Sequence, residues 1–485
     1  MLSLAILILF IPVSLFFLFF FGVYRFIITI ILKIKHGKNF YGLLSGADTF
    51  HVVGKSSNVV TFSCLMFRCG KDTSSEEFYE TCKAIILKAS VLKRLQALFC
   101  RSFGYPYLVK HEWDIEKDCI GKMKTLECSQ KRIDKQQLYT LLNYYCNAPM
   151  PKNGKAPFHM LIGTQPVSWK NDDWNYYPVM FRVHHAVADG VSLLRMMVAL
   201  TTDKLEASKE PLNSFKHEKG SLFVNKQFKR FIDGLERIKM LFLIICLHPS
   251  LLVTYFTYKA KDTNILYNTS LARQTLLGVY SEKSTEYVEK IKRIREKLPG
   301  TAFPTILIAA FSASLSDYFK KNCVQPPQYI TIAIPINVNA AKLRYLRSED
   351  VTIKDLDLSN SYSLVLVRVP IAIGNEVKSE FPVNNQVVSR LRLLNKEFDI
   401  IKHSFEYPLV LTDIIPWVPH MHHIGTSLGI MTYDGRLHVG VNVDKALISD
   451  QNDVQDITDD IFKYLKILEK EVEAFCNGDL NLSIK

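Results

Sequence analysis

Residues 179–197, VMFRVHHAVADGVSLLRMM, contain four residues whose types and spacing could do chemistry: His184, His185, Asp189 and Gly190. An imidazole titrates near neutral pH and is the usual general base. The aspartate four residues later could orient that imidazole or hold the turn through a cation elsewhere. The alternative is a buried, hydrogen-bonded histidine followed by an aspartate helix N-cap. The complete string favours catalysis over that alternative.

The two histidines do not favour a shared metal site. In a strand over 179–185, successive side chains alternate between the two faces. His185 then shares a face with Val183, whereas His184 shares the opposite face with Arg182. The imidazoles point in opposite directions and no third ligand lies at metal spacing. We predict no metal, and we expect the strand end to place a histidine at a cleft.

The string HHAVADG at 184–190 matches the HHxxxDG motif of the coenzyme-A-dependent acyltransferase superfamily, which resembles chloramphenicol acetyltransferase in fold. Residues 425–444 are similar to the closing region of the wax ester synthase/diacylglycerol acyltransferase family. LSGADTF at 44–50 resembles its opening segment. The resemblance covers most of the chain from about residue 40 to residue 475. It implies an α/β fold of two chloramphenicol-acetyltransferase-like domains with mixed sheets and an active-site channel between them.

The resemblance also implies a role for each residue of the motif. His185 is the general base, which takes the proton of an acceptor hydroxyl as its oxygen attacks an acyl-CoA thioester. Asp189 is structural and pairs with an arginine from elsewhere in the chain. Gly190 permits the turn and a close approach at the channel, and His184 packs or bonds locally. Acyl-CoA is a co-substrate, and no cofactor is implied.

The second half departs from the family pattern near its helix start. The family often has Asn-Asp-Val where this chain has Pro304, Thr305 and Ile306. Proline has no N–H to donate, so the Thr305 hydroxyl is the candidate donor to the tetrahedral oxyanion. The alternative is a helix start with proline in its first turn.

Alternating strands and helices must position the motif. We predict strands at 56–69, 158–163 and 177–185 and helices at 74–99, 134–146 and from 190, which together indicate an α/β domain. The helix from 190 is expected to bury Val191, Leu194, Met197 and Val198. In the second half we predict helices at 285–298, 304–321 and 456–475, strands at 329–338 and 361–371, and a hairpin over 425–444.

The first 32 residues carry one charged side chain, Arg25, and are long enough to span a bilayer. Lys33, Lys35 and Lys38 follow and favour a cytosolic location for the rest of the chain. Pro12 could instead bend the segment into a hairpin that enters and leaves the same face. A second apolar stretch at 240–258 indicates either an interdomain helix and loop or a segment in the membrane interface.

The 485 residues suit two domains. We predict an anchor at 1–39, an acyltransferase-like domain at 40–202, a crossover linker at 203–270 and a second such domain at 271–485. A formal net charge of +13 favours a membrane surface or phosphorylated ligands. Nucleic acid is the weakest candidate among anionic partners, because the basic residues are spread along the chain and the sequence has no zinc-finger spacing, basic arm or RNA-binding aromatic signature. We therefore predict no nucleic-acid partner. Ten cysteines without a C-x-x-C pair indicate reduced thiols.

These features predict a membrane-anchored acyl-CoA-dependent O-acyltransferase. Its acceptor would be a long-chain alcohol or diacylglycerol, and its partners would include membrane lipids. The endoplasmic reticulum is the expected membrane, with the catalytic domains facing the cytosol. Two alternatives remain: a non-catalytic lipid-binding homologue, and an acyltransferase for a soluble alcohol or amine.

Overall fold

The structure is a computed structural model, and its described residues fall into two units: the segment up to Gly37, and a compact body from Lys38 onward. The predicted segment 240–258 and most of the predicted linker lie outside the described residues. The described ranges are 2–52, 59–127, 131–170, 172, 174–201, 264–267, 270–337, 356, 358–372, 386–398, 413–420, 424–433 and 435–477.

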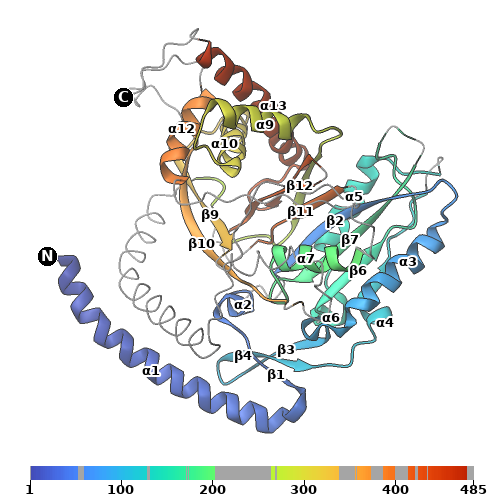
Figure 1. The fold of residues 1–485 in the computed structure, drawn as a ribbon, viewed down its shortest axis with the longest axis vertical. Helices are drawn as coiled ribbons and strands as arrows, with labels where there is room; N and C mark the ends of the chain where they lie inside the picture. Colours follow the sequence, from blue (N-terminus) through green and yellow to red (C-terminus); the bar gives the residue numbers. More distant parts are fainter. Residues whose placement is uncertain are drawn as a thin grey trace, which may run out of the picture. The chain divides into compact units, whose positions relative to one another are not determined.

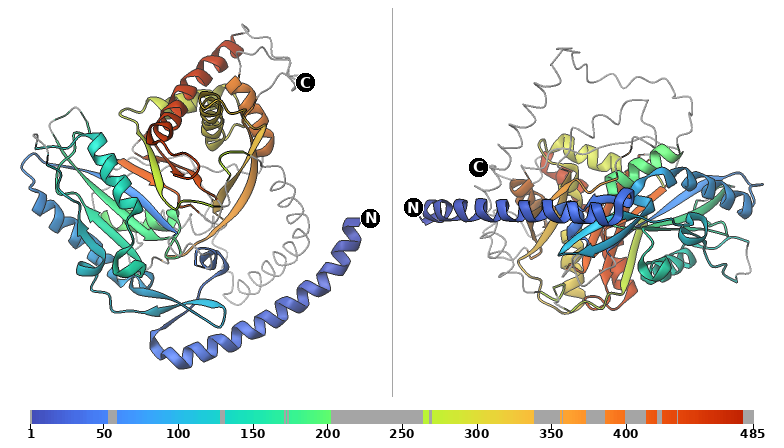
Figure 2. Two further views of the ribbon diagram at one scale, coloured as in Figure 1. Left: turned by 180° about the vertical axis from the view of Figure 1, so that it is seen from behind. Right: turned by 90° about the horizontal axis from the view of Figure 1, so that it is seen from below.

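The N-terminal unit contains one long helix, α1 (Leu2–His36). Pro12 lies inside this helix and does not end it, so the hairpin alternative is not the conformation found (Figure 2). The segment Pro12–Asn39 is long and apolar enough to cross a membrane by length and composition. Large apolar side chains such as Phe16, Phe19 and Phe26 are exposed along it.

The first half of the body is built on a five-stranded sheet with the order β11-β2-β7-β6-β5. β7 is central and antiparallel to both neighbours, whereas β5 and β6 are parallel, so the sheet is mixed. The strands are β2 (Val60–Cys69), β5 (Ile120–Lys122), β6 (Phe158–Ile162), β7 (Asn175–His184) and β11 (Asp413–Trp417).

Both faces of β7 are covered, which explains its continuous apolar sequence. Val179 and Val183 pack in one core with α3 (Ser75–Lys88) and α7 (Gly190–Thr201). Met180 packs in another core with α5 (Lys135–Asn147). The two cores confirm that alternate residues of this strand face opposite sides.

The predicted helix over 74–99 is wrong beyond Lys88. The chain continues there as two 3-10 turns, η2 (Ala89–Val91) and η3 (Lys93–Gln96), and then as strand β3 (Ala97–Ser102). Ala89, Leu92 and Leu95 are buried at a spacing of three, which suits 3-10 turns as well as an α-helix. β3 pairs with β4 (Tyr105–Lys110), and β4 with β1 (Phe40–Leu43), in a separate sheet.

The buried face of α7 also differs from the prediction. Among the side chains that the structure describes in α7, the buried apolar ones are Leu193, Met196 and Leu200. Val191, Leu194 and Met197 are half-buried, and the side chain of Val198 lies outside the described part. A helix that is apolar on nearly every side does not specify by sequence which stripe faces the core. The packing against α3 makes that choice.

The second half contains an antiparallel sheet with the order β12-β13-β8 and a pair β9-β10. α10 packs against α12 and α13, and α9 packs against α13 (Figure 1); Figure 2 shows this group of helices from behind. The elements are β8 (Thr275–Ser281), α9 (Glu286–Lys297), α10 (Phe303–Lys321), β9 (Tyr329–Asn337), β10 (Tyr362–Pro370), α12 (Gln386–Phe398), β12 (Thr426–Tyr433), β13 (Arg436–Asp444) and α13 (Gln451–Cys476).

The two halves share one strand. β11 belongs to the second half in sequence, yet it pairs with β2 at the edge of the first-half sheet. Its Asp413 is fully buried, accepts a hydrogen bond from Trp169 Nε1 at 2.8 Å and lies 2.9 Å from Arg436. A buried carboxylate needs such partners, so these contacts fix the exchanged strand.

Candidate active site

The HHxxxDG motif lies in the turn between β7 and α7. β7 ends at His184, and the backbone N–H of Val187 donates to the His184 carbonyl at 2.8 Å to close the turn. The His185 N–H donates to the carbonyl of Val59 at 2.8 Å. Asp189 then caps α7, because its Oδ1 accepts from the Ser192 N–H at 2.8 Å.

The two imidazoles have different surroundings. The His184 ring stacks on Phe99 at 5.0 Å, and its Nδ1 accepts from the Ala186 N–H at 3.2 Å. The His185 ring stacks on His51, with ring centroids 3.9 Å apart. In the described residues His185 Nδ1 has no hydrogen-bond partner. His184 therefore has a local structural contact, whereas the His185 nitrogen has acceptor or donor capacity left for another group.

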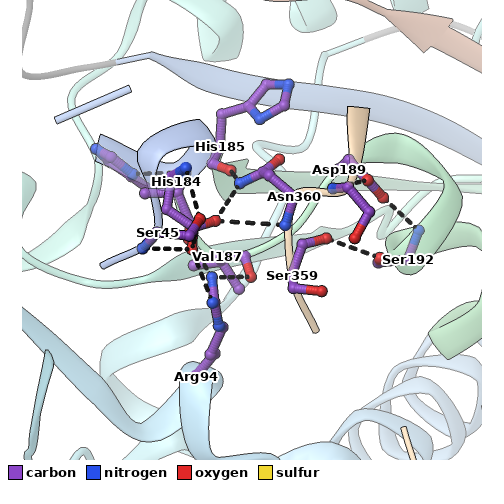
Figure 3. A network of polar contacts seen from close by, with 12 residues as sticks. Ser45, Arg94, His184, His185, Val187, Asp189, Ser192, Ser359 and Asn360 are labelled. Carbon is purple, nitrogen blue, oxygen red and sulfur yellow. Dashed lines mark hydrogen bonds and ion pairs between the residues drawn. The ribbon is translucent and has the colours of Figure 1, made fainter. Parts of the chain in front are cut away.

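A polar network lies beneath the turn (Figure 3). Asn360 Nδ2 donates to the His185 carbonyl at 2.8 Å and to Asp48 Oδ1 at 2.8 Å. Arg94 donates to Asp48 Oδ2 and to the carbonyl of Ala186, both at 2.8 Å. In Figure 3 the imidazole of His185 points away from Arg94 while its carbonyl faces Asn360. The network therefore holds the backbone of the motif and leaves the ring on the other side.

Asp48 reaches this network because a short helix presents it. Ser45 is the N-cap of α2 (Gly46–Phe50) and forms a reciprocal capping box with Asp48. Sequence reasoning noted the segment 44–50 as similar to a family segment but gave Asp48 no role. The signal was present: serine followed three residues later by an acid. Arg94, Asn360 and His51 carried no comparable sequence signal.

Burial sets the protonation of the site. It lowers the pKa of His185, although Asp189, Asn360 and Asp48 act in the opposite direction. Burial raises the pKa of Asp48, but Arg94, Asn360 and Ser45 more than offset this, so its pKa lies below the usual range. The site thus combines a neutral imidazole with an ionised carboxylate near neutral pH, which suits general-base chemistry.

Asp189 joins the two halves of the chain. Its second oxygen, Oδ2, accepts from the Ser361 N–H at 2.9 Å, and Ser361 precedes β10. The hydroxyl of Ser192 donates to the carbonyl of Ser359 at 3.0 Å. The arginine partner implied by the resemblance stays a prediction, because the interactions described for Asp189 are with backbone N–H groups.

The turn does not require glycine at 190 for steric reasons. Gly190 is the first residue of α7, its φ is not left-handed, and an added Cβ would meet no described heavy atom within 4 Å. Its expected role in the turn therefore has no steric basis, and its approach to a substrate stays a prediction.

Thr305 lies in the first turn of α10, next to Pro304, as the alternative of a helix start predicted. It is fully buried, and its Oγ1 has no hydrogen-bond partner in the described residues. No interaction found among those residues joins Thr305 to His185. The described part of the chain also contains no group of three His, Cys, Asp or Glu side chains that could hold a metal.

Comparisons with known proteins bear on the fold and on the family relation of this chain. Residues 409–469 match the family model of the WS/DGAT C-terminal domain. The wax ester synthase/diacylglycerol acyltransferase from Marinobacter aquaeolei VT8 is 12% identical, with a TM-score of 0.57 over 89% of this chain and 99% of that one. A trichothecene 15-O-acetyltransferase from Fusarium sporotrichioides is 13% identical, with a TM-score of 0.54 over 88% and 95%.

The first condensation domain of the CDA synthetase is also similar, at 11% identity and a TM-score of 0.52 over 90% of this chain and 96% of that domain. No curated relative matches the sequence. Identities this low show the fold alone, and the family match adds the relation to the WS/DGAT acyltransferases. Together they confirm the resemblance and the α/β fold class.

Proposed function

We propose that this chain, whose residues 409–469 match the WS/DGAT C-terminal domain, is a membrane-bound O-acyltransferase. It transfers a fatty acyl group from acyl-CoA to a long-chain alcohol or to diacylglycerol. His185 is the general base, and His184 and Asp189 complete the motif that holds it.

The observation that carries this proposal is the burial of His185, which favours the neutral form of its imidazole. Its side chain is 8% exposed, and burial lowers its pKa, so the imidazole is neutral when the pH is neutral. A neutral imidazole accepts a proton without first having to lose one. The motif around it is intact, and its backbone is fixed by Asn360 and Arg94.

The reaction needs one proton acceptor and no covalent enzyme intermediate. His185 takes the proton of the acceptor hydroxyl while that oxygen bonds to the thioester carbonyl carbon. The tetrahedral intermediate then breaks its C–S bond, and the proton on His185 passes to the departing CoA thiolate. The products are an ester and free CoA, and the imidazole is neutral again.

Thr305 remains the proposed hydroxyl donor to the oxyanion. Loss of one such donor typically costs about 10²–10³-fold in kcat. Thr305→Val should lower kcat by about that factor, and Thr305→Ser should retain activity, because serine keeps the hydroxyl. An unchanged kcat in Thr305→Val would assign Thr305 to the helix start alone.

Helix α1 supports membrane attachment in this proposal. A single span followed by Lys33, Lys35 and Lys38 would leave the body in the cytosol, at the surface of the endoplasmic reticulum. A lipid acceptor dissolves in that membrane, whereas acyl-CoA brings its phosphates from the cytosol, where lysine and arginine side chains can bind them. Segment 240–258 is proposed as a further interfacial contact.

The test uses cells that lack neutral-lipid synthesis. Membranes with the wild-type chain or His185→Ala are assayed with labelled palmitoyl-CoA and either hexadecanol or diacylglycerol. We expect ester from the wild type and none from the variant, and the better acceptor defines the substrate class.

A folded wild-type chain that forms no ester from either acceptor would contradict this function. Soluble alcohols and amines would then be the next acceptors to assay. Failure with those acceptors as well would leave the non-catalytic lipid-binding role, which the changed sequence at Pro304 and Thr305 keeps open.

A further inference from the structure

Two buried polar atoms of the candidate active site have no hydrogen-bond partner in the part of the chain that the structure describes: His185 Nδ1 and Asn360 Oδ1. The two side chains are 8% and 7% exposed. Buried polar atoms are nearly always hydrogen-bonded, so each exception needs a physical explanation. An amide oxygen can only accept, whereas a ring nitrogen that carries hydrogen donates. Each of the two atoms can therefore supply what the other lacks.

The orientation of the Asn360 amide is fixed by its neighbours. Its Nδ2 donates to Asp48 Oδ1 and to the His185 carbonyl, both at 2.8 Å. The pKa of Asp48 lies below its usual range, so neither oxygen has a hydrogen to give. The amide nitrogen must occupy this side, because an oxygen there would face two acceptors. In Figure 3 the amide oxygen lies on the opposite side, toward the ring of His185.

The His185 ring has one orientation that suits this acceptor. Its plane is held by the stack on His51, with ring centroids 3.9 Å apart and planes within 14°. A half turn of the ring would keep that plane but would place Cδ2 where Nδ1 now lies. A carbon at that place cannot form a comparable hydrogen bond with Asn360 Oδ1. The amide oxygen therefore favours the orientation with Nδ1 on its side.

The electrostatics of the ring agree with an acceptor at this place. Burial lowers the pKa of His185, and the groups that oppose burial include its own carbonyl, Asp189 and the Asn360 side chain. An acceptor close to a ring N–H has this effect. Asn360 also holds the His185 carbonyl through Nδ2, so one amide acts on both the ring and its backbone.

The consequence concerns the tautomer of the ring. A neutral imidazole carries one N–H, on either Nδ1 or Nε2. Because Nδ1 is fully buried, an acceptor hydroxyl cannot reach it, and Nε2 is the nitrogen that can act as the base. Nε2 accepts a proton only when the ring hydrogen is on Nδ1. An oxygen that accepts from Nδ1–H stabilises the tautomer that the reaction needs.

We propose that Asn360 is a positioning residue that selects the tautomer of His185: its Oδ1 accepts the Nδ1–H, which leaves Nε2 to take the proton of the acceptor hydroxyl. Asn360 touches His185 and not the reacting atoms. It precedes β10, so the second half of the chain supplies a part of the site that the HHxxxDG motif lacks. The inference rests on the proposed role of His185 as the base.

The test is ¹⁵N NMR of the full-length chain, labelled at histidine and held in detergent micelles at pH 7.5. A ring nitrogen that carries hydrogen and one that does not have distinct ¹⁵N shifts, so the spectrum reports the tautomer. The His185→Gln spectrum lacks the His185 signals and thereby assigns them. We expect hydrogen on Nδ1 in the wild type. Hydrogen on Nε2 would overturn the inference without any further variant.

Asn360→Leu and Asn360→Asp form a matched pair, because both lose the amide nitrogen and only aspartate keeps an oxygen. Asn360→Asp should keep hydrogen on Nδ1. Asn360→Leu should lose that preference, and its kcat should fall by about 10- to 100-fold with little change in KM, because a buried N–H loses its acceptor. A structural role alone would harm the aspartate variant at least as much, since it puts a second carboxylate beside Asp48. The same tautomer in both variants would overturn the inference.

Arg94→Met is the control for the network as a whole. It removes the cation that holds Asp48 and leaves the Asn360 amide in place. Its melting temperature should fall while the hydrogen stays on Nδ1. Loss of that tautomer in Arg94→Met would mean that the network, and not Asn360 Oδ1, selects it.

The NMR measurement does not depend on ester formation. A tautomer that requires the oxygen at residue 360, in a chain that forms no ester, would support the role of Asn360 and contradict the proposed function. Ester formation by a chain whose tautomer is unchanged in Asn360→Leu would support the function and contradict the role of Asn360.

Discussion

Two strand ends in this molecule have the same turn and different surroundings. β7 ends at His184, is followed by His185 and leads to α7; β13 ends at Asp444, is followed by Lys445 and leads to α13. β7 lies inside the first-half sheet and β13 inside the second-half sheet, and both are buried over almost their whole length.

Two hydrogen bonds are common to the two turns. The Val187 N–H donates to the His184 carbonyl at 2.8 Å, and the Leu447 N–H donates to the Asp444 carbonyl at 2.9 Å. The Ala186 N–H donates to His184 Nδ1, and the Ala446 N–H donates to Asp444 Oδ1. His184 thus occupies the position of a turn-forming aspartate, which supports a structural role for it.

The next position separates the two ends. The N–H of His185 and that of Lys445 each donate to the carbonyl of a neighbouring segment, Val59 and Gln274 respectively. Yet His185 is buried and its ring stacks on His51 at the end of α2, whereas Lys445 is exposed. The strand–turn–helix unit therefore sets the backbone position of the residue after the strand. The residues packed over the turn decide whether the side chain at that position is buried and whether its pKa is shifted.

The largest effect expected from this comparison is on catalysis. His185→Ala should lower kcat by about 10³-fold, because it removes the proposed general base. Lys445→Ala, at the equivalent position of the other turn, should leave kcat within about twofold, because an exposed side chain of this kind contributes little. Initial rates of ester formation measure both, and a comparable loss in Lys445→Ala would break the distinction between the two ends.

Arg94→Met should have the largest effect on stability. It leaves the fully buried Asp48 carboxylate without its cation, which costs about 3 kcal/mol in the free energy of unfolding. Because the pKa of Asp48 lies below its usual range, this contribution is present above about pH 4 and is lost as the pH falls through the folded pKa. Denaturant unfolding at pH 7 and pH 3 measures the difference.

Lys83→Met is the matched control, since the partners of Lys83, Glu80 and Glu116, are exposed. Its cost in the free energy of unfolding should be much smaller than that of Arg94→Met, because ion pairs with exposed partners contribute little. An equal cost for the two variants would mean that Asp48 does not depend on Arg94.

Asp189 and Asp444 lie at different positions of the two turns, but both accept from backbone N–H groups, so their variants should resemble each other in stability and differ in function. Asp189 accepts from two backbone N–H groups, and Asp444 accepts from those of Ala272, Arg273 and Ala446. Replacing either by alanine should cost about 1–3 kcal/mol, because buried donors lose their acceptor. Only Asp189→Ala should lower kcat. Thermal unfolding and rate measurements on both variants test this, and an equal loss of rate would refute it.

The smallest expected effect concerns pH. His185, the proposed base, can accept a proton only when its imidazole is neutral, and burial lowers its pKa. Activity should therefore persist as the pH falls below the ordinary histidine value of about 6.5, and it should be lost only at more acidic pH. A pH profile of kcat/KM measures this limb. A limb above pH 6.5 would mean that the imidazole is not protected by burial.

Much of the fold could be predicted from short stretches of the sequence. The hairpin over 425–444 follows from Asp-Gly between alternating apolar runs, and it forms as β12 and β13. α5 follows from its helical periodicity, and its capping box at Asp134 completes the start signal. The predicted helix over 74–99 is wrong beyond Lys88 because apolar residues spaced by three fit an α-helix and 3-10 turns equally. The pairing of β3 with β4 requires the chain to leave the helix before Ala97.

The sequence by itself determined the motif, the strand before it and the helix after it, because these depend on residue order and local hydrogen bonds. Only the tertiary structure brought α2, η3 and the segment before β10 to the same turn, which placed Asp48, Arg94 and Asn360 beneath His185. Burial and long-range polar contacts set the protonation of that imidazole. Neither is encoded in the spacing of neighbouring residues, so the chemistry of the site is a property of the packed chain.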